Sequence, residues 1–153
     1  MLLFLLNNLL ERTTEDDRFI TMFYGLIDLE SRTMEYVNAG HDPPVIYRPD
    51  SGVFEELQST GIALGIVPGE RFRLGPKVHF NKNDLMLLTT DGIWEAADPD
   101  GVAFGKKRVY EVLRECHHMS AQAILDELFR RVAEHCKGLP AKDDQTAVLF
   151  KFL

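Results

Sequence analysis

The sequence predicts an α+β protein, in which strands fill most of the first two thirds and helices are grouped near the end. Between residues 19 and 90, short runs of β-branched and aromatic residues alternate with turn residues. Two amphipathic helical patterns then follow one another, and a last apolar run occupies residues 147–153. Strands and helices that segregate along the chain are typical of α+β layers.

The length and composition fit one globular domain spanning residues 1–153 with a substantial core, since 45% of the residues are hydrophobic. The formal net charge of -7 argues against a nucleic-acid-binding protein, which needs a basic surface, but is compatible with a cation site. Cys116 and Cys136 fall in predicted helices without the spacing of a disulfide framework. We expect two buried, reduced thiols and therefore a cytoplasmic protein.

The opening MLLFLLNNLL predicts an amphipathic helix rather than a membrane span. Its apolar run is too short to cross a bilayer, Asn7 and Asn8 interrupt it, and no basic leader precedes it. Leucines recur at helical spacing and predict the apolar face, namely Leu2, Leu5, Leu6 and Leu9. No capping residue precedes this helix, which suggests that a segment upstream is absent.

The remaining elements follow from apolar runs and turn residues. A hairpin is expected from strands at 19–29 and 33–39, and further strands are expected at 45–48, 54–57, 71–74, 77–80 and 84–90. Helices are predicted over 106–118 and from an N-cap at Ser120 to a stop at Gly138 and Pro140. A final strand that enters the middle of an earlier sheet would bring Asp143 close to Asp91.

The stretch LMLLTTDGIWEA (85–96) raises a question, because an aspartate stands at the end of an apparently buried strand. Burying an unpaired carboxylate is costly, so Asp91 must be solvated or must face a cation. Taken alone, it reads more simply as a strand-ending turn residue, and Asp143 and Asp144 read as a solvated acidic loop. Trp94 is expected in the core.

Five motifs in order resemble the metal-dependent protein phosphatases of the protein phosphatase 2C superfamily. TTDGIWEA and AKDDQTAVLFKF match the two aspartate segments, and FITMFYG, YVNAGHDPP and TGIALG match the bacterial branch typified by SpoIIE and RsbU. The resemblance implies a partial PPM-type α-β-β-α sandwich of antiparallel sheets with helices outside. It also implies hydrolysis of phosphoserine or phosphothreonine on proteins.

By this resemblance, Asp91 and Asp143 are metal ligands and Asp144 supports them, while Gly92 lets the chain turn sharply. Two Mn²⁺ or Mg²⁺ ions would lower the pKa of a bridging water and clamp the phosphate, and carboxylates are the ligands that such hard ions prefer. No side-chain nucleophile is then needed. His41 is either a cleft-edge residue that touches phosphate or water, or a turn residue that fixes its loop together with Asn38.

The chain departs from the family in one respect, because the DxSGHG segment that supplies a bridging aspartate does not occur in it. We therefore expect an N-terminally truncated phosphatase domain that is impaired alone. The missing strands would leave sheet edges and the leucine face of the first helix uncovered, which predicts self-association.

Three functions remain open. The first is a phosphatase that acts on a phosphoserine regulator, of the anti-sigma-factor antagonist type, with a sensor or receiver domain upstream. The second is a non-catalytic, phosphatase-like binding module, and the third is a structural fragment whose acidic residues are incidental. No nucleic-acid or membrane partner is expected.

Overall fold

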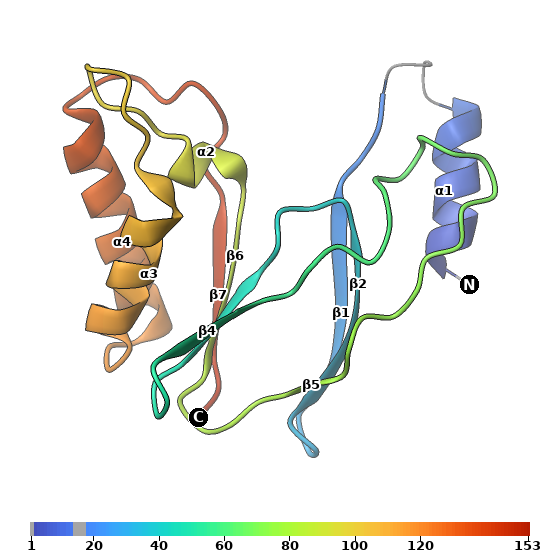
Figure 1. Ribbon diagram of the computed structural model, residues 1–153, viewed down its shortest axis with the longest axis horizontal. Coiled ribbons are helices and arrows are strands. Elements are labelled where there is room, and N and C mark those ends of the chain that lie inside the picture. Colours follow the sequence, from blue (N-terminus) through green and yellow to red (C-terminus); the bar gives the residue numbers. More distant parts are fainter. Residues whose placement is uncertain (1, 14–17) are drawn as a thin grey trace. The chain divides into compact units, whose positions relative to one another are not determined.

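The computed structural model describes residues 2–13 and 18–153, which divide into two compact units. Unit 1 comprises Met1–Pro43 and Leu57–Phe80, and unit 2 comprises Pro44–Glu56 and Asn81–Leu153. Each unit combines one antiparallel sheet with helical structure, so the predicted α+β class is confirmed (Figure 1). In the part of the chain that the structure describes, no helix is long and apolar enough to cross a membrane.

Unit 1 contains a three-stranded sheet and one helix. The predicted hairpin is confirmed, because β1 (Met22–Asp28) pairs antiparallel with β2 (Thr33–Ala39) along the whole length of both strands. The short strand β5 (Val78–His79) pairs with the opposite edge of β2. Helix α1 (Leu2–Thr13) contributes to a small apolar cluster with the sheet and the following loop, built on Leu3, Val37, Ala39 and Leu64.

Helix α1 forms as predicted, and most of its leucine face is uncovered, as expected, although Leu6 packs against the small apolar cluster. Leu2, Leu5 and Leu9 are 61%, 59% and 57% exposed, whereas Leu3 and Asn7 are buried. Asn7 orients the helix, because its Nδ2 donates to the carbonyl of Val67 (2.9 Å) and its Oδ1 accepts from the amide of Gly65 (2.9 Å). An amide whose two polar groups are both paired can be buried without the cost of an unmade hydrogen bond.

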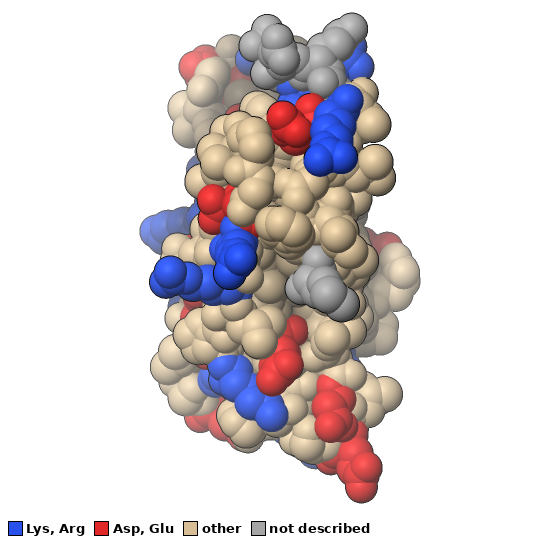
Figure 2. All heavy atoms as spheres, turned by 90° about the vertical axis from the view of Figure 1, so that its right-hand side faces the viewer, with Lys and Arg blue, Asp and Glu red and all other residues tan. Residues whose placement is uncertain are grey.

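The leucine face therefore points away from the core of unit 1. Figure 2 shows the side of the molecule on which α1 lies, where uncharged side chains cover much of the surface. An exposed apolar face of this kind favours association with another surface. Self-association through α1 stays a prediction.

Unit 2 contains a four-stranded antiparallel sheet in the order β4-β3-β6-β7. Its strands are β3 (Val45–Arg48), β4 (Val53–Glu56), β6 (Leu85–Thr89) and β7 (Ala147–Lys151). The sequence predicted that the final strand enters the middle of the sheet, and this prediction is wrong, because β7 lies at the edge. Since β3 already occupies one side of β6, β7 takes the other, with Thr89 opposite Ala147 and Leu85 opposite Lys151.

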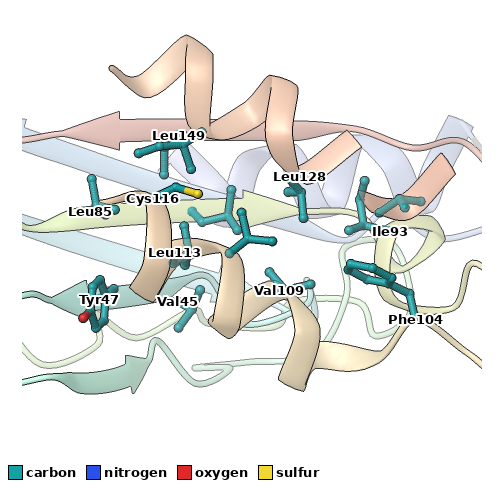
Figure 3. Packing of buried hydrophobic residues seen from close by; sticks show 14 of the residues in the cluster. Val45, Tyr47, Leu85, Ile93, Phe104, Val109, Leu113, Cys116, Leu128 and Leu149 are labelled. Carbon is teal, nitrogen blue, oxygen red and sulfur yellow. The ribbon is translucent and has the colours of Figure 1, made fainter. Parts of the chain in front are cut away.

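One face of this sheet is covered by α3 (Gly105–Cys116) and α4 (Ala121–Cys136), which form the main core with it (Figure 3). The predicted cap of α4 is confirmed, because the Ser120 hydroxyl accepts from the amide of Ala123 (3.2 Å). Cys116 and Cys136 are buried free thiols in this core, as expected. The two helices thus pack against one face of β6 and β7, and the loops at the ends of these strands lie outside this core.

Two further differences concern short segments. Residues 71–74 form a loop rather than a strand, with Phe72 as their anchor in the cluster beneath α1. A four-residue helix, α2 (Asp91–Trp94), begins directly after β6 and was not predicted. This helix turns Ile93 into the core, so that Trp94 is only half-buried, with the Nζ of Lys106 4.9 Å from the centre of its ring.

Candidate metal-binding site

The candidate site lies in unit 2, where the end of β6 meets the start of β7. Thr90 joins the two segments through three hydrogen bonds. Its amide donates to the carbonyl of Thr146 (3.0 Å), and its hydroxyl donates to the carbonyl of Asp144 (2.8 Å) and accepts from the amide of Thr146 (3.0 Å). Because Asp91 follows Thr90 directly, this clip places it beside the segment that carries Asp143.

Both aspartates are exposed at this end of the sheet. One carboxylate oxygen of each is held by the next amide in the chain. The Oδ1 of Asp91 accepts from the amide of Gly92 (3.0 Å), and the Oδ1 of Asp143 accepts from the amide of Asp144 (2.7 Å). The question raised by the sequence is thereby answered, since Asp91 is solvated and its position leaves it accessible to a cation.

Gly92 allows the two segments to approach closely. A Cβ atom at Gly92 would lie 2.5 Å from the carbonyl oxygen of Asp144 and 3.3 Å from that of Asp143. The side chain of Gln145 also donates to the carbonyl of Gly92 (3.1 Å). The resemblance attributed this glycine to a sharp turn, but Gly92 lies within helix α2. The close contact with the backbone of Asp144 is what requires a glycine here.

Asp144 contributes to this arrangement through its backbone. Its amide holds the Asp143 carboxylate, and its carbonyl accepts from the Thr90 hydroxyl. The resemblance implied that Asp144 supports Asp91 and Asp143. This role stays a proposal, and the two contacts favour it. The sequence reasoning missed Thr90 and Gln145, and the only signal for them was their place beside the two acidic segments.

His41 and Asn38 belong to unit 1, where they build a turn. Asn38 is fully buried, its Nδ2 donates to the carbonyl of Leu57 (3.1 Å), and its Oδ1 accepts from the amide of His41 (2.8 Å). The Nδ1 of His41 lies 3.4 Å from the hydroxyl of Thr21. Of the two readings of His41, this geometry favours the one in which the residue fixes its loop together with Asn38.

Replacing Asn38 by alanine should lower the free energy of unfolding by about 2–3 kcal/mol, because it leaves a buried carbonyl and a partly buried amide without partners. Thermal or urea unfolding would measure this loss. The variant His41→Ala keeps the backbone amide that Asn38 binds, so it should cost less than about 1 kcal/mol. Equal losses in both variants would contradict the role assigned to Asn38.

The donor atoms at Asp91 and Asp143 are of the kind that Mg²⁺ and Mn²⁺ prefer. Residues 2–13 and 18–153 contain no group of three or more His, Cys, Asp or Glu side chains arranged to hold a metal ion. Any ion held by these two aspartates would therefore need further ligands from water, phosphate or another segment.

The fold is similar to phosphatase domains of known structure. It matches the SiaA-PP2C domain of Pseudomonas aeruginosa with a TM-score of 0.73 and 22% identity, over 86% of this chain and 51% of that one. The PP2C phosphatase domain of SpoIIE from Bacillus subtilis gives a TM-score of 0.73 and 23% identity, over 94% and 41% of the two chains. The chain thus has the fold of part of a PP2C-type phosphatase domain.

Sequence comparison then defines the family. All of residues 1–153 match the family described as Stage II sporulation protein E (SpoIIE), and the chain belongs to that family. It is 31% identical over 130 residues to Protein IcfG of Synechocystis, covering 85% of this chain and 20% of that protein. Phosphoserine phosphatase RsbU of Bacillus subtilis is 25% identical over 146 residues, covering 95% and 43%. The chain therefore spans less than half the length of these relatives.

Proposed function

We propose that this chain forms part of a metal-dependent protein serine/threonine phosphatase domain, to which both units belong. The observation that carries the proposal is that β6 and β7 bring Asp91 and Asp143 to the same end of one sheet, in a chain of the SpoIIE family. The hydrogen bonds of Thr90 hold the two segments together, which supports a cation shared between them.

In this proposal Asp91 and Asp143 hold Mn²⁺ or Mg²⁺ through their carboxylates. A pair of such ions supplies charge neutralisation at phosphate and a more acidic water. The chain's own residues fix the two carboxylates before any ion arrives, because each accepts a backbone hydrogen bond and the segments are tied by Thr90 and Gln145. Such preorganisation lowers the cost of binding both ion and phosphate.

The site is incomplete within these 153 residues, since the DxSGHG segment with the bridging aspartate that the family resemblance implies does not occur. Two carboxylates bind a hard ion less tightly than three, and a second ion still less. We therefore infer that this chain alone turns over substrate slowly or not at all. This gap also favours the second candidate function, a phosphatase-like binding module.

The proposed substrate is a phosphoserine on a protein regulator, of the anti-sigma-factor antagonist type, and a sensor or receiver domain would control the enzyme in a longer protein. The relatives RsbU and RsbP of Bacillus subtilis are named phosphoserine phosphatases, which supports this choice. A cytoplasmic location is part of the proposal, because both cysteines are reduced thiols.

Hydrolysis of p-nitrophenyl phosphate with Mn²⁺ tests the proposal. This chain should be compared with a longer chain that carries a DxSGHG segment before residue 2. The longer chain should hydrolyse the ester about 100-fold faster or more, and only with the metal, because it regains the bridging carboxylate. A folded longer chain with Mn²⁺ bound but no activity would instead support the binding module.

A further inference from the structure

A cavity of about 250 Å³ opens beside the candidate metal site, within unit 2. Gly92 and Asp143 form part of the cavity wall, so the cavity and the candidate metal site share these two residues. The rest of the wall comes from residues 95–101, from the end of α4 at Cys136, and from residues 139–142. Its volume is below the range of pockets for drug-sized ligands and suits a single side chain.

The cavity is mainly lined by alkyl groups. Its alkyl groups come from Ala96, Ala97, Leu139, Pro140 and Ala141, while charged groups are contributed by Glu95, Asp98, Lys142 and Asp143. Three of these four groups are acids and one is a base, so the lining carries a net negative formal charge and disfavours an acidic side chain. The apolar lining favours an uncharged aliphatic group.

Hydrogen bonds hold the cavity wall in its shape. The Oδ1 of Asp98 accepts from the amides of Asp100 and Val102 (2.9 Å each), and the amide of Val102 lowers the pKa of Asp98 most strongly. Ring nitrogen Nε2 of His135 lies 2.8 Å from the carbonyl of Val102 and ties this loop to α4. In the segment that follows α4, the amide of Leu139 donates to the carbonyl of Cys136 (3.0 Å). A preformed cavity binds without a large ordering cost.

We propose that this cavity binds an aliphatic side chain of the substrate, one or two residues from the phosphoserine. The proposal rests on the proposed function, since it assumes that phosphate is held at Asp91 and Asp143. An extended peptide advances about 3.3–3.6 Å per residue. A phosphoserine at the metal site therefore places a neighbouring side chain at the cavity, which shares Asp143 and Gly92 with that site. The substrate class is then a phosphoserine flanked by a leucine-like residue.

Binding of short phosphoserine peptides to the longer chain with Mg²⁺, followed by fluorescence anisotropy, tests the proposal. The peptides carry alanine at the two positions on each side of phosphoserine, and leucine replaces each alanine in turn. One or two adjacent positions should tighten binding by about tenfold, the usual effect of filling an apolar pocket. No preference at any position, or no peptide binding, would overturn the proposal.

Two variants assign that preference to the cavity. Ala141→Leu fills it and Leu139→Ala removes part of its wall, and both side chains are exposed enough to be replaced without unfolding the core. Each should abolish the leucine preference and leave the alanine peptide bound as before. Ala133→Leu, on the exposed side of α4, is the matched control and should keep the preference. Retention of the preference in both cavity variants would overturn the proposal.

The outcome separates this proposal from the proposed function. Ester hydrolysis by the longer chain, without any leucine preference, would overturn the cavity proposal alone. A leucine preference without hydrolysis would support the cavity and leave the binding module as the function.

Discussion

Replacing Asp91 or Asp143 by asparagine should weaken Mn²⁺ binding to this chain by about 100-fold or more. Asparagine keeps the shape of the side chain but removes the negative charge, and hard divalent ions depend on that charge. Replacing a group that only orients a metal ligand already lowers metal affinity by about 10–100-fold. Calorimetric titration with Mn²⁺ measures the affinity directly, and the same changes in the longer chain should abolish ester hydrolysis.

The two single variants should lose about the same affinity, and the double variant should lose little more, because both carboxylates serve one site. Asp50→Asn is the matched control, since Asp50 is exposed in the turn between β3 and β4 and should bind no ion. Unchanged affinity in both single variants would support the third reading, in which the acidic residues are incidental.

Replacing Gly92 by alanine should destabilise the protein by about 1–3 kcal/mol, as overpacking commonly does. A loss of stability would be informative, because replacing glycine by alanine within a helix normally stabilises it by about 1 kcal/mol. Here the new Cβ would meet the backbone of Asp144 at 2.5 Å, and backbone cannot rotate aside. The segment before β7 must move, so Mn²⁺ affinity should fall about tenfold. Thermal unfolding and metal titration of one preparation give both values.

Gly52→Ala separates the site effect from general loss of stability. Gly52 has a φ of 69°, and a Cβ atom added there would have no neighbour within 4 Å, so alanine is strained at this position but meets no other atom. This variant should lower the melting temperature and keep full Mn²⁺ affinity. If Gly92→Ala behaved in the same way, the close approach of the two segments would have no role in metal binding.

The local elements could be predicted where pattern and turn residues agreed. The bounds of β2 and β3 match the predicted 33–39 and 45–48, because turn residues flank each run of apolar and β-branched residues. The buried side of α1 could not be predicted, because Asn7 faces inward to bond the carbonyl of Val67 and the amide of Gly65, which lie far along the chain. The edge position of β7 likewise depends on β3 having paired with β6.

The residues of the candidate site were predictable from the sequence, but the contacts that hold them were not. The aspartates in TTDG and KDDQ stood out because of their motifs, and β6 and β7 do bring their segments together. The hydrogen bonds of Thr90 and the close approach at Gly92 arise only from tertiary structure. The cavity beside them is formed by two segments far apart in the sequence, residues 92–101 and 136–143, so no local pattern marks it.

Line broadening by Mn²⁺ in the amide NMR spectrum tests most directly whether Asp91 and Asp143 share a cation. Paramagnetic Mn²⁺ broadens amides close to it, so small additions should broaden Gly92 and Asp144 together, before amides near exposed acids such as Asp50. Asp143→Asn should remove the effect at both positions. Broadening at only one of the two segments, or equally at all exposed acids, would contradict a shared site.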